Sequence, residues 1–196
     1  CEITFGKPTS HVNNKNEINL PEIHKLEDIK DYSIFRAMAD SEALRLKYSN
    51  SDIYNKYKPG GEISQKLYKI AEKIRYEKIG SSYFSGVKAN IEKFYQKRVS
   101  ELDLKNSEDR IIESFENYLR VKFFDFKNES EIDKKFKSYK KDLNNQFKDR
   151  ISELKELTID QEKFNYLISQ LIRDMSLDEN IDEEEKKDDD NNKDCL

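Results

Sequence analysis

Two glycines near the middle of the chain raise the first chemical possibility, because a glycine-rich turn followed by lysine can surround a phosphate group. Gly80 and Gly86 bracket the stretch SSYFS, and Lys88 follows closely. A P-loop needs the spacing G-x-x-x-x-G-K-[ST], which aims backbone amides and the lysine at the phosphates. Here five residues separate the glycines, Val87 precedes the lysine and Ala89 replaces the hydroxyl residue. We therefore predict a turn between two helices, with Gly80 as a left-handed C-cap and Gly86 at the next helix start.

Charged residues just before this turn form a second candidate. An apolar stripe along this helix reaches Ile74, and the next position of the stripe, three residues later, is Glu77. A carboxylate therefore stands where an apolar side chain is expected. Glu72 and Arg75 lie three residues apart on a neighbouring face, within reach of an ion pair. Two interpretations of Glu77 stay open. It is either solvated where the core narrows, or part of a partly buried network with Arg75 and Asn90 that fixes the turn or meets a partner.

An earlier helical segment offers two more members for such a network. Arg36 and Asp40 lie four residues apart, which places them on one helix face. The residues assigned to a partner-binding or structural network are Arg36, Asp40, Glu72, Arg75, Glu77, Gly80, Gly86 and Asn90.

The sequence predicts neither a metal site nor catalytic residues. His11 and His24 lie far apart, and neither belongs to a ligand spacing such as H-x-x-x-H, so both are expected to be surface histidines. With these two histidines there is no persuasive base for a serine or cysteine nucleophile. Cys1 and Cys195 lie at the two ends, outside any C-x-x-C spacing. With 40 acidic residues, proximity of carboxylates carries no information.

Helices must position most of these residues. Three prolines and five glycines are too few for a sandwich or barrel, and abundant Lys, Glu, Leu and Ile favour long helices. Apolar spacing predicts helices over about 28–48, from Ile63 to Gly80, from Gly86 onward, over about 108–122 and over about 129–156, with a last helix opened by a capping box of Thr158 and Gln161. Alternating polar and apolar residues in 2–6 and 17–21 predict two short strands, which we expect to form a hairpin.

The fold predicted from these patterns is mainly α, with about six helices, a short N-terminal β hairpin and an acidic tail. We expect a β element over residues 1–27, a helical domain over 28–177 and a disordered linker over 178–196. Residues 178–194 hold ten acids and three lysines, a net charge of −7, so the remainder carries −4 + 7 = +3. Such a tail buries too little apolar surface to offset its ordering entropy.

Net charge and hydropathy limit the classes of function that fit this chain. A body of +3 lacks the clustered positive charge of a strong nucleic-acid binder, although a helical scaffold or nucleic-acid-associated protein stays the alternative function. No stretch approaches the roughly 18 apolar residues of a membrane span, and no signal-peptide pattern opens the chain, so we expect a cytoplasmic protein. Because the chain opens on cysteine rather than methionine, we also expect it to be a piece of a longer protein.

Several segments, in one order along the chain, resemble the N-terminal region of the CobT subunit of aerobic, ATP-dependent cobaltochelatase. The most specific are AEKIRYEKIG (71–80) and FSGVKANI (84–91), which are similar to that family's E-x-x-R-x-E-x-x-G and G-V-x-x-N patterns. They carry Glu72, Arg75, Glu77, Gly80, Gly86, Val87 and Asn90. Residues 35–50, with Arg36, Asp40 and Leu44, resemble the family's R-G-x-A-D…A-L-R helix, and residues 160–175 resemble its closing Q-x-x-F helix.

The resemblance implies a non-catalytic assembly domain of a metal chelatase (a ligase) in cobalamin, or vitamin B12, biosynthesis. The complete subunit would continue into a von Willebrand A-type domain, whose D-x-S-x-S metal motif is missing here. It would assemble with the AAA+ ATPase subunit CobS, which uses ATP and Mg²⁺. The large subunit CobN would insert Co²⁺ into hydrogenobyrinic acid a,c-diamide. The resemblance implies no cofactor in this chain itself.

Overall fold

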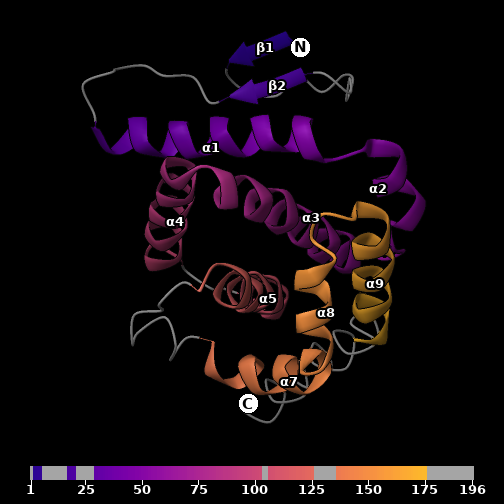
Figure 1. Cartoon of the computed structure of the whole chain (residues 1–196). Helices are drawn as coiled ribbons and strands as arrows, with labels where there is room; N and C mark the ends of the chain where they lie inside the picture. The colour runs from indigo at the N-terminus through magenta and orange to yellow at the C-terminus, as the bar shows by residue number, and fades with distance from the viewer. Residues whose placement is uncertain (1, 6–16, 21–28, 103–105, 126–135, 176–196) are drawn as a thin grey trace, which may run out of the picture.

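The computed structural model describes residues 2–5, 17–20, 29–102, 106–125 and 136–175, and most of them are helical (Figure 1). The helices are α1 (Ile29–Tyr48), α2 (Ser51–Tyr57), α3 (Glu62–Tyr83), α4 (Ser85–Ser100), α5 (Ser107–Phe124), α7 (Lys137–Phe147), α8 (Arg150–Glu156) and α9 (Gln161–Asp174). The mainly α prediction is confirmed. The acidic tail, His11, His24 and both cysteines lie outside the described residues.

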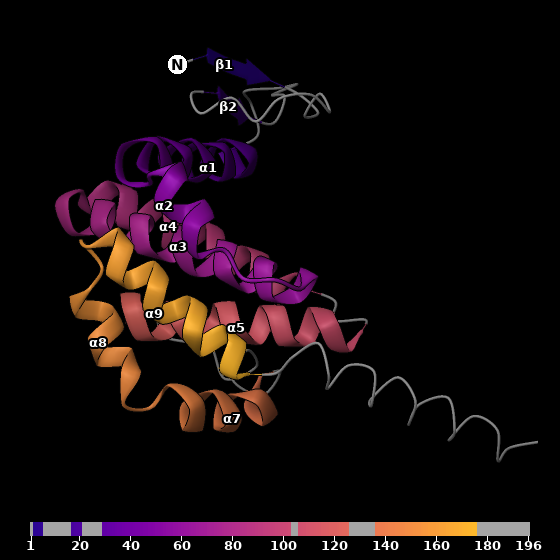
Figure 2. The same cartoon turned by 90° about the vertical axis from the view of Figure 1, so that its right-hand side faces the viewer.

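Helix α3 is the centre of the fold. It packs against α1, α4, α5 and α9, so neighbours cover it on several sides (Figures 1 and 2). Its apolar stripe explains this position, because Leu67, Ala71 and Ile74 are fully buried. Charged residues stand directly beside these buried positions, since Glu72 follows Ala71 and Arg75 follows Ile74. A helix that is covered on several sides also buries the polar residues between its apolar positions, and these need partners inside the protein.

The main core lies where α3, α5, α7, α8 and α9 meet. Phe115 and Phe147 pack edge to face with ring centroids 5.9 Å apart, and Phe123 meets Phe164 at 6.3 Å. Such pairs add to the stabilisation that the buried ring area already provides. A second, smaller cluster of Leu44, Tyr76 and Ile91 joins α1, α3 and α4.

The N-terminal strands form where the alternation predicts them, but the hairpin prediction is wrong. Strands β1 (Glu2–Phe5) and β2 (Glu17–Leu20) pair in parallel, with Ile3 opposite Ile18. Alternation specifies a strand but not its direction. The intervening residues 6–16 make a connection longer than the roughly two to five residues of a tight hairpin loop. In Figure 2 the two strands lie beyond α1, on the side away from α7.

Two helix predictions near the C-terminal half are also corrected. The helix expected over 129–156 is divided within its described part, because α7 ends at Phe147 and α8 begins at Arg150. The capping box is wrong as well. Helix α9 is capped by Asp160, whose carboxylate accepts a hydrogen bond from the backbone N–H of Lys163 at 3.1 Å. The Thr158 hydroxyl instead donates backward to the carbonyl of Lys155.

The glycine turn has a different construction from the one predicted. Helix α3 runs through Gly80 to Tyr83, and the positive φ of 78° belongs to Gly61, before α3 begins. Gly80 is needed for close packing, because a Cβ there would overlap the side-chain methyl groups of Leu44 on α1. Nothing lies within 4 Å of the equivalent position at Gly86.

Alanine substitutions at these glycines are expected to have opposite effects. Gly80→Ala should lower the free energy of unfolding by up to about 2 kcal/mol, since overpacking costs about 1–3 kcal/mol and outweighs the roughly 1 kcal/mol gained by removing a helical glycine. Gly86→Ala should raise it by up to about 1 kcal/mol. Urea denaturation measures both. Equal changes in the free energy of unfolding at the two positions would contradict the packing role of Gly80. Strictly additive effects of Gly80→Ala and Leu44→Ala would also contradict it, because residues in contact are expected to be coupled.

Candidate functional site

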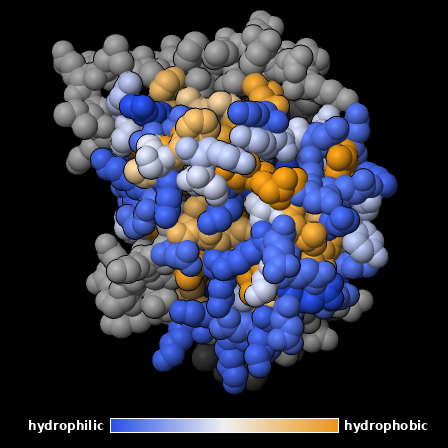
Figure 3. All heavy atoms as spheres, in the orientation of Figure 1, coloured by the Kyte–Doolittle hydropathy of each residue, from blue (hydrophilic) through white to orange (hydrophobic). Residues whose placement is uncertain are grey.

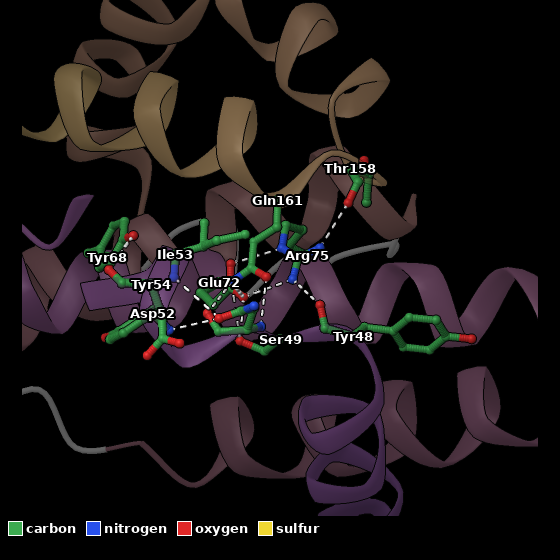
Figure 4. Close-up of polar contacts among 11 residues, drawn as sticks. Tyr48, Ser49, Asp52, Ile53, Tyr54, Tyr68, Glu72, Arg75, Thr158 and Gln161 are labelled. Atoms are coloured by element: carbon green, nitrogen blue, oxygen red, sulfur yellow. Dashed lines mark hydrogen bonds and ion pairs between the residues drawn. The ribbon is translucent and has the colours of Figure 1, made fainter. Parts of the chain in front are cut away.

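A buried polar cluster joins three segments that are far apart in sequence (Figure 4). We call it the Glu72 cluster, and it consists of the side chains of Ser49, Glu72, Arg75 and Gln161. Figure 4 shows Arg75 and Gln161 pointing toward Glu72, whereas the ring of Tyr48 points away. Glu72 and Arg75 are 3% and 1% exposed, so their mutual ion pair, with N–O distances of 2.8 Å, is shielded from water.

Arg75 binds one carbonyl at the end of α1 and one in the turn after α8. Its Nη2 atom donates to the carbonyl of Tyr48, the last residue of α1, at 2.5 Å. Its Nη1 atom donates to the carbonyl of Thr158, two residues beyond α8, at 3.1 Å. The last carbonyls of a helix such as α1 have no partner within the helix and carry partial negative charge, which a buried guanidinium neutralises. Arg75 therefore holds the end of α1 and the turn after α8 against α3.

Gln161 adds α9 to the same cluster. Its amide oxygen accepts from the backbone N–H of Asn50 at 2.7 Å, and its amide nitrogen donates to the Asn50 carbonyl at 3.0 Å. The same nitrogen donates to Glu72 at 3.0 Å. Asn50 is the N-cap of α2, so Gln161 fixes the start of α9 to the turn between α1 and α2.

Both oxygens of the Glu72 carboxylate are bound by groups of the same chain. The carboxylate accepts four hydrogen bonds, from Ser49 at 2.7 Å, from Gln161 at 3.0 Å and twice from Arg75 at 2.8 Å. Oε1 accepts three of these bonds and Oε2 accepts the fourth, from Nε of Arg75. The cluster braces helices and does not present a base to a substrate.

A second buried cluster lies further along α3, and we call it the Arg120 cluster. Arg120 of α5 donates to Glu77 at 2.9 Å and to Glu116 at 2.8 Å. Arg98 of α4 binds the other oxygen of Glu116 at 2.6 Å, and Ser41 of α1 donates to Glu77 at 2.5 Å. The cluster thus connects α1, α3, α4 and α5, and together the two clusters reach α1, α4, α5 and α9, which pack on α3.

Electrostatics favour the charged forms of Glu116 and Arg120. Burial alone would raise the pKa of Glu116, but Arg120 and Arg98 outweigh it and keep that pKa below its ordinary value. Burial would lower the pKa of Arg120, but Glu77 and Glu116 raise it above the ordinary value of a guanidinium. The Arg120 guanidinium also lies 4.7 Å from the ring centroid of Tyr95, which favours the cation further.

The structure places the predicted site residues at several separate locations. Glu72 and Arg75 share one cluster, Glu77 belongs to the other, and Asn90 instead donates to Asp40 at 2.8 Å. The structure does not join Glu77, Arg75 and Asn90 in one network. Arg36 is exposed on α1, Gly80 lies at the contact with Leu44, and Gly86 is the second residue of α4.

Sequence reasoning missed the residues that complete both clusters. Glu116 and Arg120 lie four apart and follow the apolar positions Phe115 and Leu119, so an oppositely charged pair beside a buried stripe was the available signal. Ser49 and Gln161 carried no such signal, because their partners are distant in sequence.

A pocket of about 470 Å³ lies beside the Glu72 cluster. The residues that line it are Lys47, Tyr48, Arg75, Ile79, Tyr83, Phe84 and Ile159. On the face drawn in Figure 3, hydrophobic atoms gather near the middle, with hydrophilic side chains around them.

Two features are absent from the described residues. Among the described residues, no three His, Cys, Asp or Glu side chains come together in a way that would hold a metal ion. In the same part of the chain, no helix combines the length and apolar character needed to cross a bilayer.

Comparison with known proteins identifies a family. The model of a family described as "Cobalamin biosynthesis protein CobT" matches residues 1–195, nearly the whole chain. No curated protein and no solved structure matches the sequence or the fold.

Proposed function

Because the chain belongs to the CobT family, which acts in cobalamin biosynthesis, we propose that its helical part is a non-catalytic assembly domain of an ATP-dependent cobaltochelatase. In this proposal the domain organises a multi-subunit complex and leaves the chemistry to other subunits. ATP hydrolysis with Mg²⁺ belongs to an AAA+ partner of the CobS type. Insertion of Co²⁺ into hydrogenobyrinic acid a,c-diamide belongs to a large subunit of the CobN type.

The engagement of Glu72 and Arg75 within the chain is the observation that carries this proposal. The two residues are the most polar part of the family-like motif, yet their other hydrogen bonds go to Ser49 and Gln161 and to the carbonyls of Tyr48 and Thr158, all of the same chain. Because the polar side chains of this motif already brace helices of the same chain, they support the interpretation of the domain as a rigid platform for partner subunits. A substrate site would need at least one group free to donate or accept.

Reconstitution tests the proposal directly. The full subunit is mixed with the CobS-type and CobN-type subunits from the same source, with and without ATP and Mg²⁺, and complexes are sized by light scattering after gel filtration. We expect the subunit to join a complex with at least one partner. We also expect Co²⁺ insertion to require the subunit, with no insertion by the subunit alone.

A matched deletion locates the role in this domain. A subunit lacking residues 29–175 should lose partner binding, whereas a folded fragment that keeps them should retain it, with folding checked by circular dichroism. Cobalt insertion that proceeds equally well without these residues would contradict the proposal.

A further inference from the structure

The pocket beside the Glu72 cluster is built from four parts of the chain. Lys47 and Tyr48 come from the end of α1, and Ile159 comes from the turn between α8 and α9. Phe84 lies between α3 and α4, and α3 itself contributes positions 75, 79 and 83, which share one helix face. The Glu72 cluster fixes three of these parts to one another, so the pocket has a rigid frame.

Exposed apolar side chains converge on this pocket. In the part of the chain that the structure describes, five large hydrophobic side chains are exposed, and three of them line it: Tyr83 at 68%, Phe84 at 51% and Ile159 at 71%. Scattered exposed apolar residues are ordinary, but a group of them around one hollow marks an interaction surface. The hollow is suited to an apolar anchor, since the guanidinium of Arg75 is already bound to Glu72, Tyr48 and Thr158.

Lysines surround the apolar lining. Lys47 is exposed and lines the pocket itself. Lys78, next to Ile79, interacts electrostatically with both Lys88 and Lys155. Burial lowers the pKa of Lys78, Asp125 raises it, and the two other lysines lower it further, so both of these lysines lie within electrostatic range of Lys78.

The last two of these lysines also lie close to pocket residues along the chain. Lys88 donates its backbone N–H to the carbonyl of Phe84 at 3.1 Å. The Lys155 carbonyl accepts from Thr158, the neighbour of Ile159. Asp125 opposes these lysines, and the buried pair of Glu72 and Arg75 adds no net charge, so the named groups together carry positive charge. We call Lys47, Lys78, Lys88 and Lys155 the lysine rim.

We propose that this pocket binds a segment of a partner subunit in which one aromatic or branched aliphatic side chain is flanked by carboxylates. The inference rests on the proposed assembly function and names its contact surface. The apolar anchor would cover Tyr83, Phe84 and Ile159, and the carboxylates would pair with the lysine rim. Anchors of this kind, buried in a pocket and enclosed by polar contacts, carry most of the energy of many interfaces.

Binding measurements on surface variants test the pocket. The full subunit and its variants are titrated against immobilised CobS-type and CobN-type subunits by biolayer interferometry. The double variant Phe84→Ser with Ile159→Ser should bind at least tenfold more weakly, because it removes two exposed apolar contacts without opening the core. The control Tyr32→Ser alters a similarly exposed aromatic residue elsewhere (49% exposed) and should bind like the wild type.

The role of the lysine rim and the identity of the partner segment are tested in separate experiments. The double variant Lys47→Glu with Lys88→Glu should bind at least tenfold more weakly at low salt and should show a flatter salt dependence, since rim charges act through screened attraction. Replacement of Ile159 by the photo-crosslinking residue p-benzoylphenylalanine should capture a partner peptide with an apolar residue among acidic ones.

The outcomes separate this inference from the proposed function. If the wild-type subunit binds neither partner, both fail. If it binds and the pocket variants bind equally well, or the cross-linked peptide is basic, the assembly function stands and the pocket inference is overturned. It is also overturned if the variants leave partner binding unchanged and instead dissociate a homodimer, or if the cross-link forms to residues 178–196 of the same chain.

Discussion

Replacing Arg75 by alanine is expected to lower the free energy of unfolding by about 3–5 kcal/mol, the usual effect of breaking a buried ion pair from one side. The variant leaves Glu72 charged in a site where it is 3% exposed. It also leaves the carbonyls of Tyr48, at the end of α1, and of Thr158, in the turn after α8, without the guanidinium that they bind. Urea denaturation followed by circular dichroism measures the loss.

A closely matched pair provides the control. Arg150 and Glu153 on α8 have the same residue types and the same three-residue spacing, at 2.9 Å, but their side chains are 46% and 51% exposed. Arg150→Ala should cost less than about 1 kcal/mol, because water screens exposed pairs. Equal losses at the two positions would contradict the role assigned to burial.

Removing both charges of the Glu72 cluster provides the complementary test. Arg75→Met combined with Glu72→Gln should recover part of the loss, since the uncompensated buried charge is gone. Partner binding by this double variant separates stability from assembly. If the fold recovers and binding does not, the charged cluster also shapes the surface that the partner meets.

Much of the helical frame was predictable from apolar spacing. The stripe of Ile63, Leu67 and Ile74 located α3, and the pattern around Phe115 and Leu119 located α5, because a period near 3.6 reports which helix face is covered. The same patterns said little about strand direction or helix breaks. Alternation in β1 and β2 is equally compatible with parallel and antiparallel pairing.

The polar interior was harder to predict, for a physical reason. Periodicity describes one helix at a time, whereas a buried charge depends on what another helix brings to it. Glu77 meets Arg120 across 43 positions, and Glu72 meets Gln161 across 89. The i,i+3 pair of Glu72 and Arg75 was within reach of local reasoning, but its burial was not. Gly80 shows the same limit, since the need for a residue without a side chain at this position comes from Leu44 on another helix.

Replacing Arg120 by methionine is the second large prediction, with an expected loss of about 3–5 kcal/mol near neutral pH. Methionine roughly preserves the apolar stem but removes the cation between Glu77 and Glu116. Glu116 keeps Arg98 at 2.6 Å, whereas the nearest remaining cation to Glu77 is Lys73 at 3.9 Å. Arg45→Met, which breaks the half-exposed pair with Glu42, should cost less than about 1 kcal/mol.

The pH dependence of stability distinguishes this loss from one caused by poor packing. In the wild type the pKa of Glu116 is lowered, so its contribution is present above about pH 4.3, the pKa in the unfolded chain, and is lost as the pH falls toward the folded-state value. In Arg120→Met, burial still raises the pKa of Glu116 but the Arg120 guanidinium no longer lowers it, so this pKa should rise and the variant should lose less stability than the wild type as the pH falls. The difference between the two proteins should therefore shrink between pH 8 and pH 4.5. A constant difference across that range, measured by urea denaturation at each pH, would indicate a packing defect and contradict the charge argument.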